Sequence, residues 1–222
     1  MYFCDKGIVL RHKDVKEFDR IVSIFSEKHG RMEVIFKGVR KPQAKLMCFS
    51  EVMCHSDFRF YLSKYTTMPL CTGASLINSY NSIREDLDKI TNFFFISDIF
   101  VLMTPINQSS FEKYKLLISA LDYISKSNKI SKWFKTVFML NFLECFGVGF
   151  KKTQVGYDSR MWEIIHSGFE RIDELCEYDY VYQDISGFAI EQMNKHSPRE
   201  IKTEFYDRLC DWRSYELSRY NK

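Results

Sequence analysis

The first 77 residues alternate between hydrophobic and polar side chains with a period of two. Met32, Val34 and Phe36 fall on one face of an extended chain, and Arg31 and Glu33 fall on the other. Such alternation is typical of a strand with one buried face. Similar patterns predict five strands, at residues 7–11, 20–25, 31–37, 58–62 and 70–77. We expect these strands to close into a barrel, because an open sheet would expose two unpaired edges.

The hydrophobic pattern changes to a helical period after residue 80. Ser82 and Ser109 are each followed three residues later by a glutamate, which is the spacing of a capping box at a helix N-terminus. These signals predict helices that begin near residues 82, 109, 131 and 198. Gly147 is expected to end the third helix, because glycine adopts the left-handed cap without strain. Residues 147–185 show no sustained period, so we expect loops there with one short hairpin and a helical turn.

These patterns predict an α+β protein with two domains, a five-stranded barrel over residues 1–79 and a mostly α-helical domain over residues 80–222. No hydrophobic stretch is long enough to cross a bilayer, and the short apolar core of the N-terminus lacks the length of a secretory signal. The seven cysteines form no C-x-x-C pair and suit a reducing compartment. We therefore expect a soluble, cytoplasmic protein that does not associate with membranes.

Positive charge is concentrated at the front of the chain. Residues 1–75 contain 13 lysines and arginines and 8 acidic residues, although the net charge of the whole protein is only +3. The segment FKGVRKPQAKL, residues 36–46, contains four cationic residues and no acid. With Tyr61 and Tyr65 expected nearby, such a loop offers cations for phosphates and aromatic faces for bases, which favours single-stranded nucleic acid as the partner. A solvated loop that only keeps the domain soluble is the alternative.

The sequence contains no recognisable catalytic or metal-binding motif. The five histidines are scattered without an H-E-x-x-H pattern, and neither a G-x-S-x-G motif nor a phosphate-binding glycine loop of the P-loop type is present. The sequence therefore predicts a protein that is not an enzyme and that uses no cofactor.

Several of these segments resemble the RecO family of bacterial recombination mediators. The resemblance is carried by residues 7–42, which include D-R-I-V-S-I-F-S, an H-G turn and K-G-V-R, and by residues 82–87 and 141–147. It implies an N-terminal OB-fold barrel followed by a helical domain. It also implies binding of single- and double-stranded DNA, annealing of complementary strands, and work with RecR and with the single-strand-binding protein SSB to load a recombinase. We expect a monomer in isolation, associated with the nucleoid.

The position of the K-G-V-R motif makes Lys37 and Arg40 the best candidates for phosphate contacts. Arg31, Lys41 and Lys45 are added as neighbours on charge and proximity alone.

Many members of the family carry a four-cysteine zinc module after the helix that ends at Gly147. Residues 148–195 of this chain contain only Cys176, which cannot form a tetrahedral cysteine site. We therefore predict a zinc-free protein in which aromatic residues stabilise this region instead. The aromatic residues are Tyr157, Trp162, Tyr178, Tyr180 and Tyr182.

Lys132, Trp133, Phe134 and Lys135 combine apolar and basic side chains that would suit the acidic, apolar C-terminal tail of SSB. Packing of the two aromatics in a helical core is the alternative interpretation. The function predicted from the whole sequence is a non-enzymatic mediator of DNA repair and homologous recombination. Two rival hypotheses are a protein-interaction adaptor with only incidental DNA binding, and a nuclease that uses scattered carboxylates.

Overall fold

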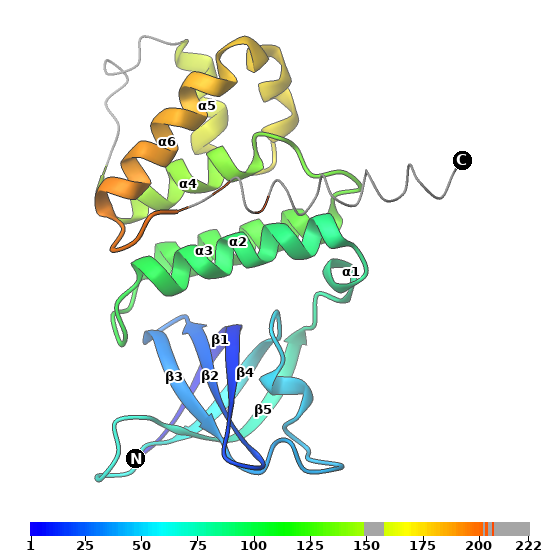
Figure 1. Ribbon diagram of the computed structural model, residues 1–222, viewed down its shortest axis with the longest axis vertical. Coiled ribbons are helices and arrows are strands. Elements are labelled where there is room, and N and C mark those ends of the chain that lie inside the picture. Colours follow the sequence, from blue (N-terminus) through cyan, green and yellow to red (C-terminus); the bar gives the residue numbers. More distant parts are fainter. Residues whose placement is uncertain (149–157, 202, 204–205, 207–222) are drawn as a thin grey trace. The chain divides into compact units, whose positions relative to one another are not determined.

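The computed structural model describes residues 1–148, 158–201, 203 and 206 of the chain. The chain forms two compact units, and strands precede helices along it (Figure 1). The barrel unit consists of Met1–Asn81 and Ser97–Tyr114. The helical unit consists of Ser82–Ile96 and Lys115–Lys222.

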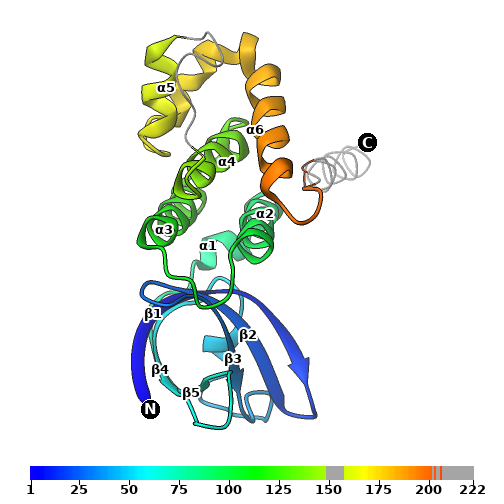
Figure 2. The ribbon, with the colours of Figure 1, turned by 90° about the vertical axis from the view of Figure 1, so that its left-hand side faces the viewer.

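The barrel unit is built on five strands that close on themselves in the order β1-β2-β3-β5-β4. Figure 2 shows these strands curving around a common centre. Neighbouring strands are antiparallel except β3 and β5, which pair in parallel at Ile35 and Leu70. This order is that of an OB-fold barrel, which confirms the predicted fold class. The strands are β1 (Tyr2–Val15), β2 (Asp19–Ser26), β3 (Gly30–Phe36), β4 (His55–Tyr61) and β5 (Leu70–Asn78).

The barrel closes because β1 is long enough to pair on both sides. Its first half pairs with β4 and its second half with β2, and both ladders include Gly7. A Cβ atom at Gly7 would lie 2.5 Å from Cγ2 of Ile24, so only glycine lets the two strands approach this closely. The inward positions of the alternating pattern form the apolar core, including Val9, Val22, Ile24, Met32, Val34, Phe36, Phe58 and Phe60.

A short segment after α2 (Leu87–Met103) packs against the turn between β2 and β3. We call residues 104–108 the strap. The backbone N–H of Asn107 donates to the carbonyl of Arg31 at 2.8 Å, and Nε of Arg31 donates to the carbonyl of Thr104 at 2.8 Å. Gly30, with φ +68°, lies so close to the strap that a Cβ atom would be 1.9 Å from the carbonyl oxygen of Gln108. The strap therefore fixes one end of the barrel through backbone contacts.

The helices follow the predicted order, with corrections at their first residues. The predicted helix at Ser82 is instead a short helix, α1 (Asn81–Arg84), followed by α2. Asp86 caps α2 by accepting from the backbone N–H of Asp88 at 2.8 Å, whereas the Ser82 hydroxyl contacts Ser125. In the same way Ser110, rather than Ser109, caps α3 (Phe111–Lys126), because its Oγ accepts from the backbone N–H of Lys113.

The core of the helical unit is lined by aromatic side chains on α4 (Phe134–Cys145). Phe134, Phe138 and Phe142 are fully buried and stack along one face of this helix. The helix ends before Gly147, whose φ of +86° is the predicted left-handed cap. The rings of Tyr123 and Phe169 pack on Phe134 from other elements.

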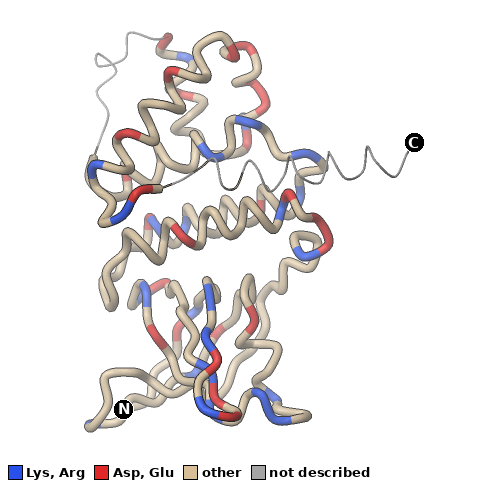
Figure 3. The backbone as a smooth tube through the Cα atoms, viewed as in Figure 1, with Lys and Arg blue, Asp and Glu red and all other residues tan. Residues whose placement is uncertain are grey.

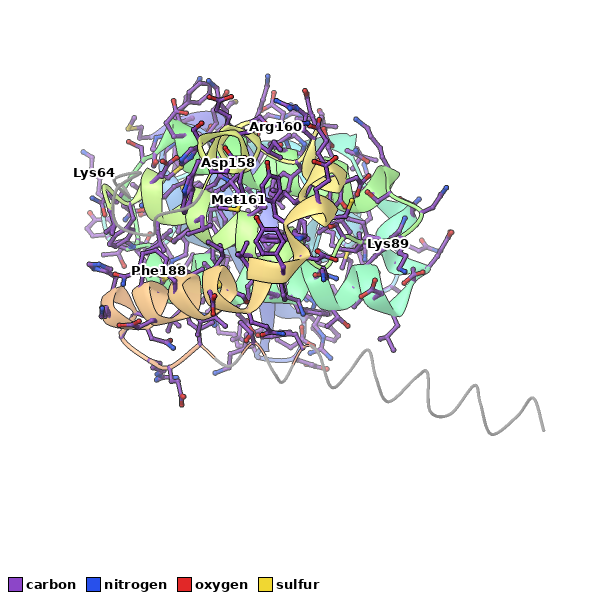
Figure 4. All side chains as sticks on the ribbon, turned by 90° about the horizontal axis from the view of Figure 1, so that it is seen from above. Lys64, Lys89, Asp158, Arg160, Met161 and Phe188 are labelled. Carbon is purple, nitrogen blue, oxygen red and sulfur yellow. The ribbon has the colours of Figure 1, made fainter. Side chains whose placement is uncertain are left out.

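The segment predicted to be mostly loops is mainly helical where the structure describes it, with turns at residues 167–171. It contains α5 (Ser159–His166), the 3₁₀-helix η2 (Ile172–Val181) and α6 (Tyr182–His196), and residues 158–201 contain no strand. The expected hairpin is therefore absent from this described part. A 3₁₀-helix repeats every three residues, so η2 blurs the helical period in the sequence. Asp158 caps α5 by accepting a hydrogen bond from the backbone N–H of Arg160 at 3.0 Å. Figure 4 labels both residues.

The aromatic residues expected to stabilise this region differ in their burial. Trp162 and Tyr178 are buried, and Tyr182 packs edge-on against Trp133 with ring centroids 5.0 Å apart. Tyr180 is 79% exposed and does not support the core. Tyr157 and the body of the helix predicted from residue 198 lie outside the described residues. Among the described helices, none is both long and apolar enough to cross a membrane.

Candidate nucleic-acid interface

Three loops gather at one end of the barrel unit, at the bottom of Figure 1. They connect β1 to β2, β3 to β4, and β4 to β5. We call residues 37–47, the first part of the β3–β4 connection, the basic loop; Figure 3 shows its cationic residues at the lower right. The strap lies at the other end of β3. The three loops therefore frame a surface on which this fold family commonly binds oligonucleotides.

The basic loop is ordered by a series of turns. Gly38 adopts φ +63°, and its backbone N–H donates to Oδ1 of Asp19 at 2.8 Å. Three backbone hydrogen bonds then close successive turns. The N–H groups of residues 41, 44 and 47 each donate to the carbonyl three residues earlier. Val39 is 1% exposed and anchors the loop in the barrel core. The lysines of the loop consequently point outward from a fixed backbone.

The structure separates the five predicted DNA-binding residues into three groups. Lys37, Lys41 and Lys45 are exposed on or beside the basic loop. Arg40 is also exposed but is engaged by neighbouring groups, and Arg31 lies elsewhere.

Arg40 belongs to a network of charges beside the basic loop. Its Nε lies 3.2 Å from Oδ2 of Asp14, and its Nη1 donates to the carbonyl of Glu17. Arg20 joins the other oxygen of Asp14 at 2.9 Å and Glu51 at 2.7 Å. The hydrogen bond from Arg20 is the main cause that lowers the pKa of Asp14. Because Asp14 partly neutralises Arg40, this arginine serves first to hold the loop against β1.

The expectation that Arg31 lies beside the basic loop is wrong. Arg31 and Lys37 are at opposite ends of the strand β3, and the Arg31 side chain is only 13% exposed. Burial lowers the pKa of Arg31, and its guanidinium contacts Glu33 and the strap. Sequence proximity misled here because a strand of seven residues separates its two ends by about 20 Å.

The structure adds one cation that the sequence analysis did not select. Arg59, in the middle of β4, faces outward between the buried rings of Phe58 and Phe60. It lines a groove together with Lys37 and Lys45. The alternation of β4 indicated only that Arg59 is on the polar face, and the folded barrel is needed to bring it near the basic loop.

This basic groove has a volume of about 560 Å³. Its three cations surround an apolar floor, and the described residues that line it include no aspartate or glutamate. Within the described part of the chain, no ion pair is found for Lys37, Lys45 or Arg59. The groove thus combines uncompensated positive charge with apolar surface. It is lined by Lys37, Gly38, Val39, Ala44, Lys45, Leu46, Phe49, Arg59, Thr72, Gly73 and Ala74.

A second groove of about 430 Å³ continues from the first across Lys37 and Gly38. Lys16 and Lys41 contribute further positive charge, and Nζ of Lys41 lies 5.4 Å from the centre of the Phe18 ring. The acidic residues Glu17 and Asp19 also line this groove, so its charge is less one-sided than that of the basic groove.

The two tyrosines that were expected beside the cations do not line either groove. Tyr65 is 94% exposed in the β4–β5 loop, and Tyr61 packs against Tyr2 with ring centroids 4.8 Å apart. Among the described residues that line the basic groove, the aromatic one is Phe49.

The predicted partner site in the helical unit is corrected by burial. Trp133 and Phe134 are 1% and 0% exposed, so their rings belong to the core and offer no surface to a tail. Nε1 of Trp133 donates to Oδ1 of Asp179 at 2.9 Å, and Lys132 contacts the other oxygen of Asp179. Lys135 is half-buried, with its Nζ 5.8 Å from the Phe95 ring centre. The aromatic pair in this segment therefore reflects the packing of the start of α4 in the core.

A closed OB-type barrel with a cationic groove is an arrangement found in many proteins that bind oligonucleotides. Residues 1–80 match the family model described as Recombination protein O N terminal. The matched residues contain all five strands of the barrel, and the match agrees with the resemblance to the RecO family seen in the sequence. The family name denotes a recombination protein rather than an enzyme activity, in agreement with the prediction of a non-enzymatic protein.

Three relatives are each named "DNA repair protein RecO". The protein of Acetivibrio thermocellus is 26% identical over 76% of this chain and 68% of its own length. The protein of Moorella thermoacetica is 32% identical over 56% of this chain, but the match covers only 46% of that protein. The protein of Mycoplasma mycoides subsp. mycoides is 25% identical over 79% of this chain and 71% of its own. The matches thus cover between 46% and 71% of the length of these three relatives.

Proposed function

We propose that the barrel unit binds single-stranded DNA at the basic groove and that the chain acts in DNA repair and recombination. The observation that carries the proposal is the set of three exposed cations, Lys37, Lys45 and Arg59, which line a groove with an apolar floor and with no acidic residue among its described lining residues. A polyanion gains most at such a site, because each phosphate that is neutralised releases counterions.

The apolar floor argues against a binding site for acidic proteins alone. Leu46, Phe49 and Ala74 line the same groove as the cations, and a nucleic-acid strand would present sugars and bases to them next to its phosphates. The similarity to proteins named for DNA repair supports the same choice. The adaptor hypothesis, by contrast, explains the charges but not their alternation with apolar surface.

The finer steps rest on the family resemblance. We propose that the protein anneals complementary single strands and works with RecR and SSB to load a recombinase. The barrel would promote annealing by holding strands close together. When its cations neutralise the phosphates of one strand, the repulsion of a second strand falls and the local concentration of strands rises. No nucleotide is consumed in such a process.

The experiment that tests the proposal is fluorescence anisotropy of a labelled single-stranded oligonucleotide over a salt series. If Lys37, Lys41, Lys45 and Arg59 each neutralise one phosphate, the log-log slope is about −2.8, and raising the salt from about 50 to about 200 mM weakens binding about 50-fold. The variant Lys37→Gln/Lys45→Gln should reduce the slope to about −1.4.

The matched control is Lys126→Gln/Lys129→Gln, which removes the same charge from the exposed surface of the helical unit. This control should keep the slope of the wild type. Equal slopes for all three proteins, with each shown to be folded by circular dichroism, would contradict the proposed site.

A further inference from the structure

The basic groove contains a contact that charge alone does not require. Arg59 on β4 lies directly across from Gly73 on β5 in the ladder between these strands. A Cβ atom at Gly73 would lie 3.1 Å from Nε, 3.3 Å from Cζ and 3.5 Å from Nη2 of Arg59. Because three atoms of the guanidinium are at nearly the same distance, the group rests with one face against the backbone of Gly73.

The local backbone favours this placement. The pairing of β4 and β5 shifts register between Arg59 and Phe60, and Thr72 donates its hydroxyl hydrogen to the carbonyl of Arg59 at 3.1 Å. The irregularity allows the outward side chain of Arg59 to lie along β5, where glycine leaves room for it. The opposite face of the guanidinium is directed away from the strand.

A planar cation with one face supported is a stacking surface. Arginine guanidinium groups stack on aromatic rings, and nucleic-acid bases stack on arginine as they do on aromatic side chains. Lys37 and Lys45 line the same groove and would hold the phosphates on either side of such a base. The groove volume of about 560 Å³ is within the range of sites that hold small organic ligands.

We propose that Arg59, held flat by Gly73, is the platform on which one unpaired base of single-stranded DNA stacks within the basic groove. This inference rests on the proposed function and adds the part of the strand that is recognised. Bases in a duplex are stacked on one another and cannot enter the groove. The platform therefore selects single strands over duplex DNA, whereas the lysines bind the phosphates of both.

The test compares two probes that have the same phosphates. One is a labelled 12-nucleotide thymidine strand, and the other is a strand of equal length in which every base is replaced by an abasic spacer. The wild type should bind the thymidine strand at least about fivefold more tightly, the lower limit for one stacked base. A duplex of the same length shows how much binding remains when the bases are paired.

Two variants act on the platform without removing its charge. Arg59→Lys keeps the positive charge and loses the plane, and Gly73→Val forces the guanidinium off the backbone. Both should bring the affinity ratio of the two probes close to one, because the base loses its stacking surface while a positive charge remains at residue 59. Arg11→Lys, at an exposed arginine of β1 outside the groove, is the matched control and should keep the ratio of the wild type.

The outcomes separate this inference from the proposed function. If the wild type binds both probes alike with a steep salt slope, DNA binding stands and the stacking platform is wrong. If the ratio is high but unchanged in Arg59→Lys and Gly73→Val, the base is recognised elsewhere and the platform is also wrong. If no probe binds in a salt-dependent way, the proposed function itself fails.

Discussion

Gly30 and Gly38 offer a direct measure of what the strap contributes to the barrel. Both adopt positive φ, +68° and +63°. A Cβ atom at Gly38 would meet nothing closer than Cδ of Lys41 at 3.8 Å, whereas one at Gly30 would lie 1.9 Å from the carbonyl oxygen of Gln108. The substitutions Gly38→Ala and Gly30→Ala thus share the conformational strain and differ in the backbone contact.

The expected magnitudes follow from these contacts. An alanine with left-handed backbone angles lowers the free energy of unfolding by about 1–2 kcal/mol. The stiffer unfolded chain offsets about 0.4–1 kcal/mol of this loss. Gly30→Ala must also displace the strap and weaken the hydrogen bonds that join Arg31 to Asn107 and Thr104. With about 1 kcal/mol for the neutral bond and about 1.5–3 kcal/mol for the charged one, we expect Gly30→Ala to cost about 3 kcal/mol more than Gly38→Ala.

The assay is amide hydrogen exchange, followed by mass spectrometry on peptides from β2 and β3. Tryptophan fluorescence is unsuitable, because all three tryptophans lie beyond residue 115 and none reports on the barrel. The free energy of opening should fall for both variants and fall much further for Gly30→Ala. Equal losses in the two variants would refute the argument that the strap stabilises this end of the barrel.

Two other properties of the barrel can be checked by titration and labelling. The pKa of Asp14 is lowered chiefly by its hydrogen bond from Arg20. The ion pair therefore adds stability above the ordinary value of 3.8 and loses it as the pH falls below that value, so thermal unfolding of Asp14→Asn should depend less on pH between about 5 and about 2. Burial raises the pKa of Cys71 to about 12. At pH 8 iodoacetamide should therefore modify the exposed thiols of Cys4 and Cys48 well before that of Cys71, as measured by mass spectrometry. Labelling of all three thiols at equal rates would contradict this prediction.

The strands could be predicted because their signal is local. Met32, Val34 and Phe36 alternate with more exposed neighbours, and all three are buried in the barrel. The same logic gave the core of α4, since Phe134 and Phe138 recur at helical spacing. Their burial follows from one amphipathic element packing against others, whichever elements those are.

Features that depend on contacts between distant segments could not be predicted in this way. Ser82 has a capping-box spacing, yet Asp86 competes for the same role and the Ser82 hydroxyl bonds to Ser125 on α3. The alternation of β4 indicates only that Arg59 faces outward. Its position across from Gly73 and beside the basic loop is set by the tertiary structure. The site was therefore predicted as a run of charge, and its groove required the tertiary structure.

The most direct test of the central claim is to locate bound DNA on the protein by photocrosslinking. A single-stranded oligonucleotide that contains 5-iododeoxyuridine is bound to the full chain, irradiated, and the modified peptides are identified by mass spectrometry. We predict crosslinks in residues 37–49, which include Phe49, at Arg59 of β4, and in residues 72–74 of β5. Crosslinks confined to the helical unit, at residues 82–96 or 115–222, would contradict the assignment of the basic groove as the site that holds the strand.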